Sequence, residues 1–490
     1  MLWPIIRKDW KLLRRSVIVV AIFNALERII AAGGGPFQDF HTRIPRILLH
    51  AYDPAALAVT ALLMILIVQT DPIVALRQEW VIRPIRRRDL ILSKILFVVL
   101  FVQAPIFLLE VIECLASGFP LAPSIAAPLQ HSVWMLLAFD VPMLALAAIT
   151  HNLRGAVGVA VAYFLGITAV VIVAQQMRTE LIVQNDLWLA AGARTLWACA
   201  AGLAILAMQY CWRKTARARI AFAAMVAIWM MLELLPWRPA FAVEERLSPQ
   251  PSPAGRIQLA FAPEAGLASH PTAVGPMRDH LRLMVPLRVT GLTGTRLLIR
   301  DAVKIEVIAP NGERIAAFTT NGAVLSASNT LAWQPAWIAS GDYDRIQHEP
   351  VTIQLDYSLT LLQPSPEQRM PAAGADRWLP GVGRCATRIG DPGSVEVGCL
   401  APGYAPFFTL FLEPHDSGTQ EAGRPQTDTY GYAPFLARIS GDSISRFKAE
   451  FGNVENPARR QILFRPYTVA SHFARRVTIT DVRLADWRLE

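Results

Sequence analysis

Two patterns of apolar residues divide the chain near residue 245. Long apolar stretches recur before the Pro- and Ser-rich linker at 246–256, and apolar and polar residues alternate with a period of two beyond it. A transmembrane helix needs about 20 mostly apolar residues, whereas alternation is typical of half-buried strands. We predict seven membrane spans, at 16–34, 54–76, 90–112, 129–149, 155–176, 187–210 and 219–237. The expected fold is an α-helical polytopic membrane domain over 16–239, followed by a β-rich domain over 257–490.

The alternating half carries the signals of a β-sandwich. Four segments read as strands: HLRLMVPLRVTGL, DAVKIEVIAP, PVTIQLDYSLTLL and RRVTITDVRLADWRL. Asn311-Gly312 between two of these apolar runs predicts a hairpin turn. Short strands with frequent turns favour a sandwich. The length allows either two sandwiches, at 257–365 and 375–490, or a single decorated one.

Composition strengthens the membrane interpretation of the first half. Apolar residues make up 53% of the chain and charged residues only 17%, against about 25% charged in ordinary soluble domains. The net charge of +9 lies entirely in residues 1–239, which hold 22 basic and 13 acidic residues. A nucleic-acid-binding protein would place a basic face on its soluble domain. We therefore expect membrane lipid, and no nucleic acid, around this region.

The distribution of Lys and Arg in short loops predicts the orientation. With the N-terminus inside, the inner segments hold Arg7, Lys8, Lys11, Arg14, Arg15, Arg77, Arg83, Arg86, Arg87, Arg88, Arg154, Arg213, Lys214, Arg217 and Arg219. The outer short loops hold only Arg43, Arg46 and Arg178. By the positive-inside rule the N-terminus is cytoplasmic. Seven crossings then place 257–490 outside, in the periplasm or beyond it, and compact loops favour a bacterial inner membrane.

Residues 1–15 form the first of two distinctive cytoplasmic elements. Trp3, Ile6, Trp10 and Leu13 recur at helical spacing, so they line one face of a helix. Basic residues cover much of the remaining surface. This pattern predicts an amphipathic helix that lies in the inner membrane interface. A simple positive-inside flank is the alternative.

The loop between the second and third spans is the second distinctive element. It opens with Glu79, and Pro84 disfavours a helical conformation of Arg83 before it. Asp89 follows at the start of the next helix, where a carboxylate favours the helix dipole. Lys94 lies one turn further on. A charge run of this kind can be a topology signal alone, but the order of residue types is more specific than that signal requires.

Residues 1–212, through their topology and this loop, resemble the permease subunits of ABC-2 type ABC transporters. The residues that carry the resemblance are Glu79, Arg83, Pro84, Arg87, Asp89, Leu90 and Lys94. The resemblance implies a six-helix transmembrane domain, export, and a dimer or pair of permeases. It also implies that helix 1–15 and loop 77–89 contact a separate ATP-binding subunit. The implied coupling set is Glu79, Arg83, Pro84, Arg86, Arg87, Arg88, Asp89 and Lys94.

The chain lacks a phosphate-binding loop of the form GxxxxGK[ST]. ATP and Mg would therefore bind to the partner subunit, and this chain needs no cofactor of its own. The seventh span and the large outer domain depart from the permease pattern. This departure puts the substrate in doubt more than the family.

Charges inside predicted spans are the remaining candidates for function. They include Glu27 and Arg28 in the first span, Asp140 in the fourth and Arg194 in the sixth. Asp140 either forms a structural pair, for example with Arg194, or lines a transport path. We expect no histidine to join these carboxylates within the spans, which argues against a proton relay.

The outer half contains one pair of cysteines, Cys385 and Cys399. A Gly/Pro turn and a short strand separate them, so a hairpin could bring them together, and an oxidising compartment would allow a disulfide. Two cysteines make a poor zinc site, and no metal is expected. No HExxH or GxSxG motif occurs, so we expect no enzyme activity. A membrane-anchored extracytoplasmic binding or sensor protein is the main alternative to a permease.

Overall fold

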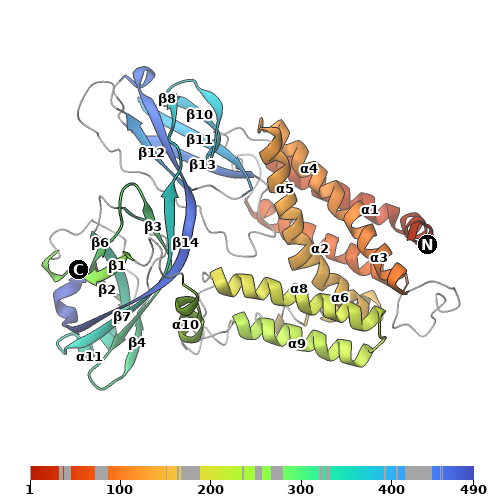
Figure 1. The fold of residues 1–490 in the computed structure, drawn as a ribbon, viewed down its shortest axis with the longest axis horizontal. Coiled ribbons are helices and arrows are strands. Elements are labelled where there is room, and N and C mark those ends of the chain that lie inside the picture. The colour runs from red at the N-terminus through yellow and green to blue at the C-terminus, as the bar shows by residue number, and fades with distance from the viewer. Residues whose placement is uncertain are drawn as a thin grey trace.

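The protein consists of a helical region followed by a β-rich region (Figure 1). The computed structural model describes residues 2–32, 37, 46–71, 87–150, 152–159, 161–162, 165–166, 188–233, 237–248, 256–265, 280–317, 319, 324–326, 331–390, 393–403, 407–413, 444–452, 454 and 456–489. The coarse division predicted from the two hydrophobic patterns is confirmed.

Two long helical segments, here called rods, run from Arg87 to Ala116 and from Leu121 to Ile149, and a π-helical turn interrupts each of them. The helices are α1 (Leu2–Ala32), α2 (Arg46–Gln69), α3 (Arg87–Val98), α4 (Ala104–Ala116), α5 (Leu121–Met135), α6 (Val141–Ile149), α8 (Trp188–Tyr210), α9 (Thr215–Glu233) and α10 (Trp237–Leu247). The π-helical turn η3 (Val99–Gln103) joins α3 to α4, and η4 (Leu136–Asp140) joins α5 to α6.

Three helical segments are long and apolar enough to cross a membrane: Asp89–Ala116, Leu121–Ile149 and Thr215–Leu232. Ala55–Gln69 is a shorter apolar helix. The predicted span 16–34 overlaps the second half of α1, and the predicted span 187–210 coincides closely with α8. Most of the predicted span 155–176 lies outside the described residues. The described part of the chain therefore contains fewer helices that qualify as membrane spans than the seven predicted.

Helix α1 runs without a break through both the predicted interfacial segment 1–15 and the first predicted span. Its buried face includes Ile6, Asp9, Leu13 and Val17, while Trp3 is 67% exposed. The predicted grouping of Trp3 with Ile6 and Leu13 on one face therefore differs from the packed face. Tertiary packing decides which face is buried, because α2, α3 and α4 pack against α1.

The described part of the β-rich region forms three sheets. The main strands are β1 (Gln258–Phe261), β2 (His280–Thr290), β3 (Leu297–Ile308), β4 (Arg314–Ala317), β6 (Leu331–Ala339), β7 (Val351–Pro364), β8 (Gln368–Pro371), β9 (Asp376–Leu379), β10 (Gly383–Gly390), β11 (Ser394–Pro402), β12 (Phe407–Glu413), β13 (Ile444–Phe451), β14 (Gln461–Val482) and β15 (Arg488–Leu489). Short strand β5 (Val324–Ser326) and helix α11 (Ser340–Ile346) complete the region. Gly312 adopts a φ of 84° in the predicted turn between β3 and β4.

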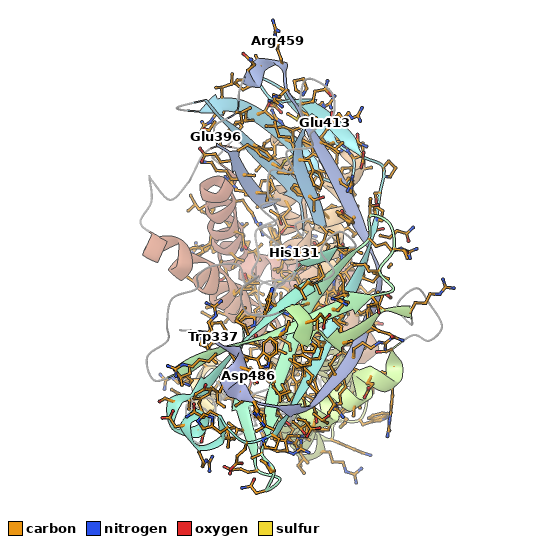
Figure 2. The ribbon with its side chains drawn as sticks, turned by 90° about the vertical axis from the view of Figure 1, so that its left-hand side faces the viewer. His131, Trp337, Glu396, Glu413, Arg459 and Asp486 are labelled. Atoms are coloured by element: carbon orange, nitrogen blue, oxygen red, sulfur yellow. A yellow bond between two sulfur atoms is a disulfide. The ribbon has the colours of Figure 1, made fainter. Side chains whose placement is uncertain are left out.

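The strands form two lobes that share the 22-residue strand β14. In the lower lobe of Figure 1, β14 pairs with β7 opposite the sheet of β1, β2, β6 and β15. In the upper lobe it pairs with β12 and β8 opposite the sheet of β9, β10, β11 and β13. Each lobe has its own apolar core. Figure 2 shows Glu396, Glu413 and Arg459 in one lobe and Trp337 and Asp486 in the other.

A simple division at 365/375 does not separate these lobes. The chain leaves the lower lobe after β7, builds the upper lobe, and returns along β14 to end as β15 beside β2. The register of β14 against β7 shifts between Val469 and Ser471, just beyond the residues that pair with β12, and the strand passes from one core to the other there.

Helix α10 fastens the helical region to the lower lobe. Trp237, Phe241, Glu244 and Ser248 lie one or two turns apart and are all buried against the sheet. Ser358 donates a 2.6 Å hydrogen bond to Glu244, and the Ala474 amide donates to Ser248. The predicted linker 246–256 therefore begins within α10, and residues 249–255 of it lie outside the described residues.

Candidate functional site

The predicted coupling segment is described only at its end. Glu79, Arg83, Pro84 and Arg86 lie outside the described residues, and so do the side chains of Arg87 and Arg88. Asp89 lies in the first turn of α3, as the helix dipole favours. The structure therefore places the segment between the end of α2 and the start of α3, and leaves its own contacts undefined.

Lys94 belongs to a buried ionic network where these two helices meet α1. Its ammonium donates to Asp9 at 2.8 Å, to Asp71 at 2.8 Å and to Thr70 at 2.6 Å. Lys8 donates to both oxygens of Asp71, at 2.5 and 2.6 Å. Lys94 is 2% exposed and Asp9 is fully buried. Lys94 is therefore an internal residue that joins three helices, and a partner protein could not reach it in this conformation.

A second buried cluster joins α1 to α4 and α5. Arg28 donates to Glu110 at 2.8 Å and lies 3.9 Å from a carboxylate oxygen of Glu113. The Nδ1 atom of His131 lies 2.7 Å from the same Glu110 oxygen. Glu110 is fully buried. The expectation that no histidine joins the carboxylates of the predicted spans is wrong, because His131 lies within the predicted span 129–149.

A contact between an amide and a carboxyl group lies between the two ionic clusters. Gln103, the last residue of η3, donates a 2.5 Å hydrogen bond to Asp140, the last residue of η4. Asp140 is fully buried and makes no ion pair with Arg194, although both residues are described. The suggested pairing of these two charges is therefore not found in this structure.

The three contacts occur at different levels along the helices. Asp9 and Arg28 are 19 residues apart in α1, which at 1.5 Å per residue separates them by about 28 Å. This distance is close to the thickness of a bilayer's hydrocarbon core, about 30 Å. Gln103 lies nine residues after Lys94 and seven before Glu110. The order is thus an ionic cluster at each end and an amide–carboxyl contact near the middle.

The predicted intramembrane set also includes Glu27 and Arg194. The side chain of Glu27 lies outside the description. Arg194 is buried in α8, at 4% exposure. Further along α8, Gly202 lies against Val141, where an added Cβ would come within 2.8 Å of the valine side chain. This close approach brings α8 beside Asp140.

The upper β lobe rests on the turn between α4 and α5. Arg384 donates to the Ser117 carbonyl at 2.7 Å, and Trp378 meets Phe119 edge to face. Gly118 adopts a φ of 78° directly beneath the guanidinium. Cys114, from the same turn of α4 as Glu113, contacts the lobe's apolar residues through a shared cluster. The lobe therefore contacts the helix that carries Glu110.

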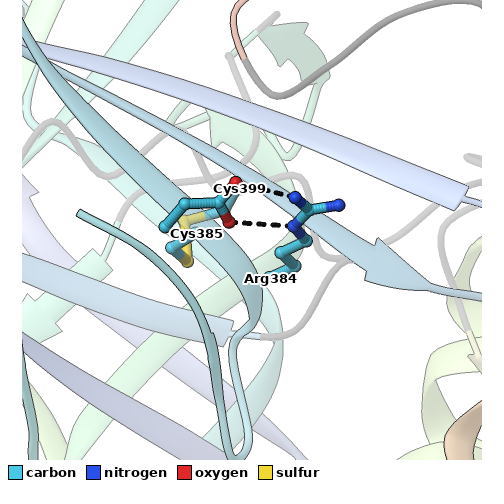
Figure 3. Close-up of a disulfide and its surroundings, with 4 residues drawn as sticks. Arg384, Cys385 and Cys399 are labelled. Atoms are coloured by element: carbon cyan, nitrogen blue, oxygen red, sulfur yellow. Dashed lines mark hydrogen bonds and ion pairs between the residues drawn. A yellow bond between two sulfur atoms is a disulfide. The ribbon is translucent and has the colours of Figure 1, made fainter. Parts of the chain in front are cut away.

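The predicted cysteine pair occupies this docked sheet. Cys385 and Cys399 lie opposite each other in β10 and β11 and form a disulfide. Figure 3 shows Arg384 beside the bridge. Its guanidinium donates two hydrogen bonds, of 2.7 and 2.8 Å, to the Asp376 carboxylate. The bridge thus holds together the two strands that present Arg384 to the helices.

Sequence reasoning missed four of the residues in these contacts. Asp9 and Asp71 were hidden among the basic residues and the span boundary, and Gln103 carries no charge that would mark it. His131 was visible inside a predicted span. A search for Gln or Asp two residues before Pro, as in Gln103-Ala-Pro105 and Asp140-Val-Pro142, would have found the central pair.

The described residues contain no group of three or more His, Cys, Asp and Glu side chains placed to hold a metal ion. The buried carboxylates have Lys, Arg, His or Gln side chains as partners. Such contacts can bind or move protons and can couple helix movements, but they offer no nucleophile paired with a base.

Comparisons with known proteins do not identify a family. No family model and no curated protein matches the chain. Among solved structures, red sea bream transglutaminase shows 15% sequence identity and a TM-score of 0.12 over 51% of this chain and 32% of that protein. A TM-score this low carries no argument about fold or function.

Proposed function

We propose that this chain is the permease subunit of an ABC-type exporter in a bacterial inner membrane. A separate ATP-binding subunit would bind at the cytoplasmic side and supply the energy. The β-rich region would lie on the outer side. Two permease chains would form the transport path, as the family resemblance implies.

The network of Lys8, Asp9, Asp71 and Lys94 is the observation that carries this proposal. Asp71 ends the described chain before the arginine-rich segment, and Lys94 lies two turns into the helix that follows it. The chain on either side of the segment is therefore held to α1, by the partly exposed pair of Asp71 with Lys8 and by the buried pair of Lys94 with Asp9. A force applied to the segment by a partner would reach three helices together.

The surface of the helical region supports a membrane location. Large apolar side chains are exposed along α1 and α5, among them Ile18, Val19, Ile22, Leu26, Leu121, Ile125, Leu129 and Val133. Contiguous exposed apolar surface of this kind marks a membrane or protein interface. Lipid acyl chains would cover it without leaving polar backbone groups unpaired, because the elements are helices.

Co-purification tests the partner directly. Replacement of Arg86, Arg87 and Arg88 by Gln should reduce the amount of native ATP-binding subunit that co-purifies with the chain by at least tenfold, because rim charges set register and association. The corresponding Lys variants should retain most of it. Gln replacements of Arg369 and Arg459 in the β-rich region serve as the matched control. Unchanged co-purification of the Gln triple variant would remove the coupling proposal.

A membrane-anchored sensor is the second candidate. The contact of Arg384 with Ser117 favours it, because a ligand bound to the upper lobe could shift the α4–α5 turn without any transport. The two candidates differ in their partner. Isolation of a kinase or regulator, and no ATP-binding subunit, with the wild-type chain would favour the sensor.

A further inference from the structure

The helical rods Arg87–Ala116 and Leu121–Ile149 share an unusual local sequence at the point where they touch. Gln103 ends η3 and is followed two residues later by Pro105, while Asp140 ends η4 and is followed two residues later by Pro142. Proline lacks an N–H group, so each rod has lost one backbone hydrogen bond at this level. Single π-helical turns occur frequently at functional sites. The repeated arrangement directs attention to the contact between these two side chains.

The contact leaves two oxygen atoms without a partner. Gln103 Nε2 donates to Asp140 Oδ2. Asp140 Oδ1 and Gln103 Oε1 are both buried and accept no hydrogen bond. Asp140 is fully buried and Gln103 is 6% exposed. Buried polar atoms are almost always satisfied, so each exception requires an explanation.

One proton accounts for both unsatisfied oxygens. A protonated carboxyl group donates one hydrogen bond and accepts another. An acid and a primary amide can therefore pair through two hydrogen bonds, Nε2–H to Oδ2 and Oδ1–H to Oε1. We propose that Asp140 and Gln103 form a proton-binding site in which the protonated acid pairs with the amide through both bonds. Proton binding forms an O–H bond at Oδ1 and leaves the carboxyl neutral.

Among the described residues, no other charged side chain lies beside Asp140 to neutralise it. Along its own rod, His131 is nine residues away, about 13 Å. On the rod of Gln103, Lys94 and Glu110 are nine and seven residues away, about 13 and 10 Å. On α8, Arg194 is eight residues, or about 12 Å along the helix, from Gly202, which packs against Val141 next to Asp140. On α1, which packs against η3, the charged Asp9 and Arg28 belong to the two end clusters.

The bound proton would hold the two rods together at this level. With the proton bound, the pair is neutral and both oxygens are satisfied. Loss of the proton leaves a buried carboxylate opposite the amide oxygen, which is costly away from water, and favours separation or hydration of the two π-helical turns. Coupling of this change to transport rests on the proposed permease function. Proton binding by Asp140 and the contact between the two rods do not.

Infrared spectroscopy of the purified full-length chain tests the site. Wild-type protein should show the C=O stretch of a protonated carboxyl group at neutral pH, and Asp140→Asn should lack that band. Gln103→Leu should keep the band and shift it, because the acid loses its hydrogen-bond partners. A spectrum of Asp140→Asn identical to wild type in this region would show that Asp140 is ionised and would overturn the proposal.

Thermal unfolding in detergent gives an independent readout. Asn at position 140 can form the same two hydrogen bonds to Gln103 without a proton. The unfolding midpoint of wild type should fall as pH rises, because the native state then loses the proton, and Asp140→Asn should lack this part of the dependence. Equal pH dependence of the two proteins would count against the site.

Addition of Na⁺ distinguishes the proton from a metal cation. At constant pH, replacement of choline by Na⁺ should leave the carboxyl band unchanged. Removal of the band by Na⁺ would show a sodium site and would overturn the assignment to a proton. Neither readout depends on an ATP-binding subunit, so failure of the proposed function would leave these outcomes interpretable.

Discussion

The two regions of this chain bury charge in opposite surroundings. In the helical region, Asp9 and Glu110 are fully buried, and Lys94, the partner of Asp9, is 2% exposed. In the β-rich region, Glu306 and Asp356 are also buried, but Arg314 and Arg476, which pair with them, have side chains that are 39% and 38% exposed. These two pairs of the β-rich region thus reach water through their arginines, whereas the Asp9–Lys94 and Arg28–Glu110 pairs of the helical region lie inside.

The apolar residues show the reverse distribution. Exposed large apolar side chains occur throughout the described helices, whereas in the described β strands only Ile389 and Val469 belong to this class. Burial of an apolar side chain lowers the free energy when it removes apolar surface from water, but not when it removes that surface from lipid. The comparison supports the proposal that lipid surrounds the helical region and water the β-rich region, with the boundary near α10.

Replacement of Lys94 by Met should have the largest effect on stability. It would leave Asp9 buried without its main cation, and loss of one partner of a buried pair costs about 3–5 kcal/mol. Chemical unfolding of the purified chain in detergent measures the loss. Lys8→Met is the matched control and should cost less, because its side chain is 34% exposed. The Asp9→Asn/Lys94→Met double variant should recover part of the loss; a loss equal to the sum of the single variants would contradict the network.

Removal of the disulfide should have the next largest effect, confined to the upper lobe. The bridge closes a loop with a sequence separation of 14 residues, and a loop of this length corresponds to about 3 kcal/mol. Denaturant unfolding of Cys385→Ser/Cys399→Ser, followed by proteolysis, measures it. Alkylation of the native protein, with mass spectrometry, provides the control on location. Free thiols at both positions in protein from intact cells would contradict an oxidising outer compartment.

Acid should weaken the attachment of α10 to the lower lobe. Burial alone would raise the pKa of the Glu306 carboxyl, but Lys304, Arg314 and Arg238 together hold it below its usual value. A lowered native pKa means that Glu306 stabilises the fold above the ordinary pKa and that this contribution is lost as pH falls through the lowered value. Glu306→Gln should cost about 1–3 kcal/mol at neutral pH. The variant should also lose less unfolding free energy than the wild type as the pH falls. An equal loss in the two proteins would contradict this role of Glu306.

Replacement of Arg384 by Gln should have the smallest effect. The side chain is 32% exposed and its pair with Asp376 lies at the surface, so the expected loss is about 1 kcal/mol or less. The contact with Ser117 should nevertheless be lost. A cysteine introduced at Ser117, probed for its accessibility to a thiol reagent, should become more reactive in the variant. Equal reactivity would show that Arg384 does not hold the lobe on the helices.

The sequence predicted those features that depend on local pattern. Apolar length marks α3 to α6, alternation marks β2, β3, β7 and β14, and the Asn311-Gly312 turn needs only neighbouring residues. Which residues face inward on α1 could not be read in the same way. Trp3 and Ile6 have similar local signals, and only packing against other helices separates them.

The candidate site was predicted in part for the same reason. Arg28 and Asp140 are conspicuous as charges in apolar stretches, but their partners Glu110 and Gln103 are set by how rods distant in sequence cross. The suggested pairing of Asp140 with Arg194 used charge alone, and helix geometry decided otherwise. The continuity of β14 through two cores is likewise a property of tertiary structure.

Site-specific labelling tests most directly the claim that the arginine-rich segment lies inside and the β-rich region outside. In chains whose Cys211 is replaced by Ser, a single cysteine is introduced at Arg86 or at Arg369, and cells with an intact inner membrane receive a membrane-impermeant thiol reagent. The account predicts labelling of Arg369→Cys in sealed cells and of Arg86→Cys only after the membrane is opened. Labelling of Arg86→Cys in sealed cells, or protection of Arg369→Cys, would contradict it.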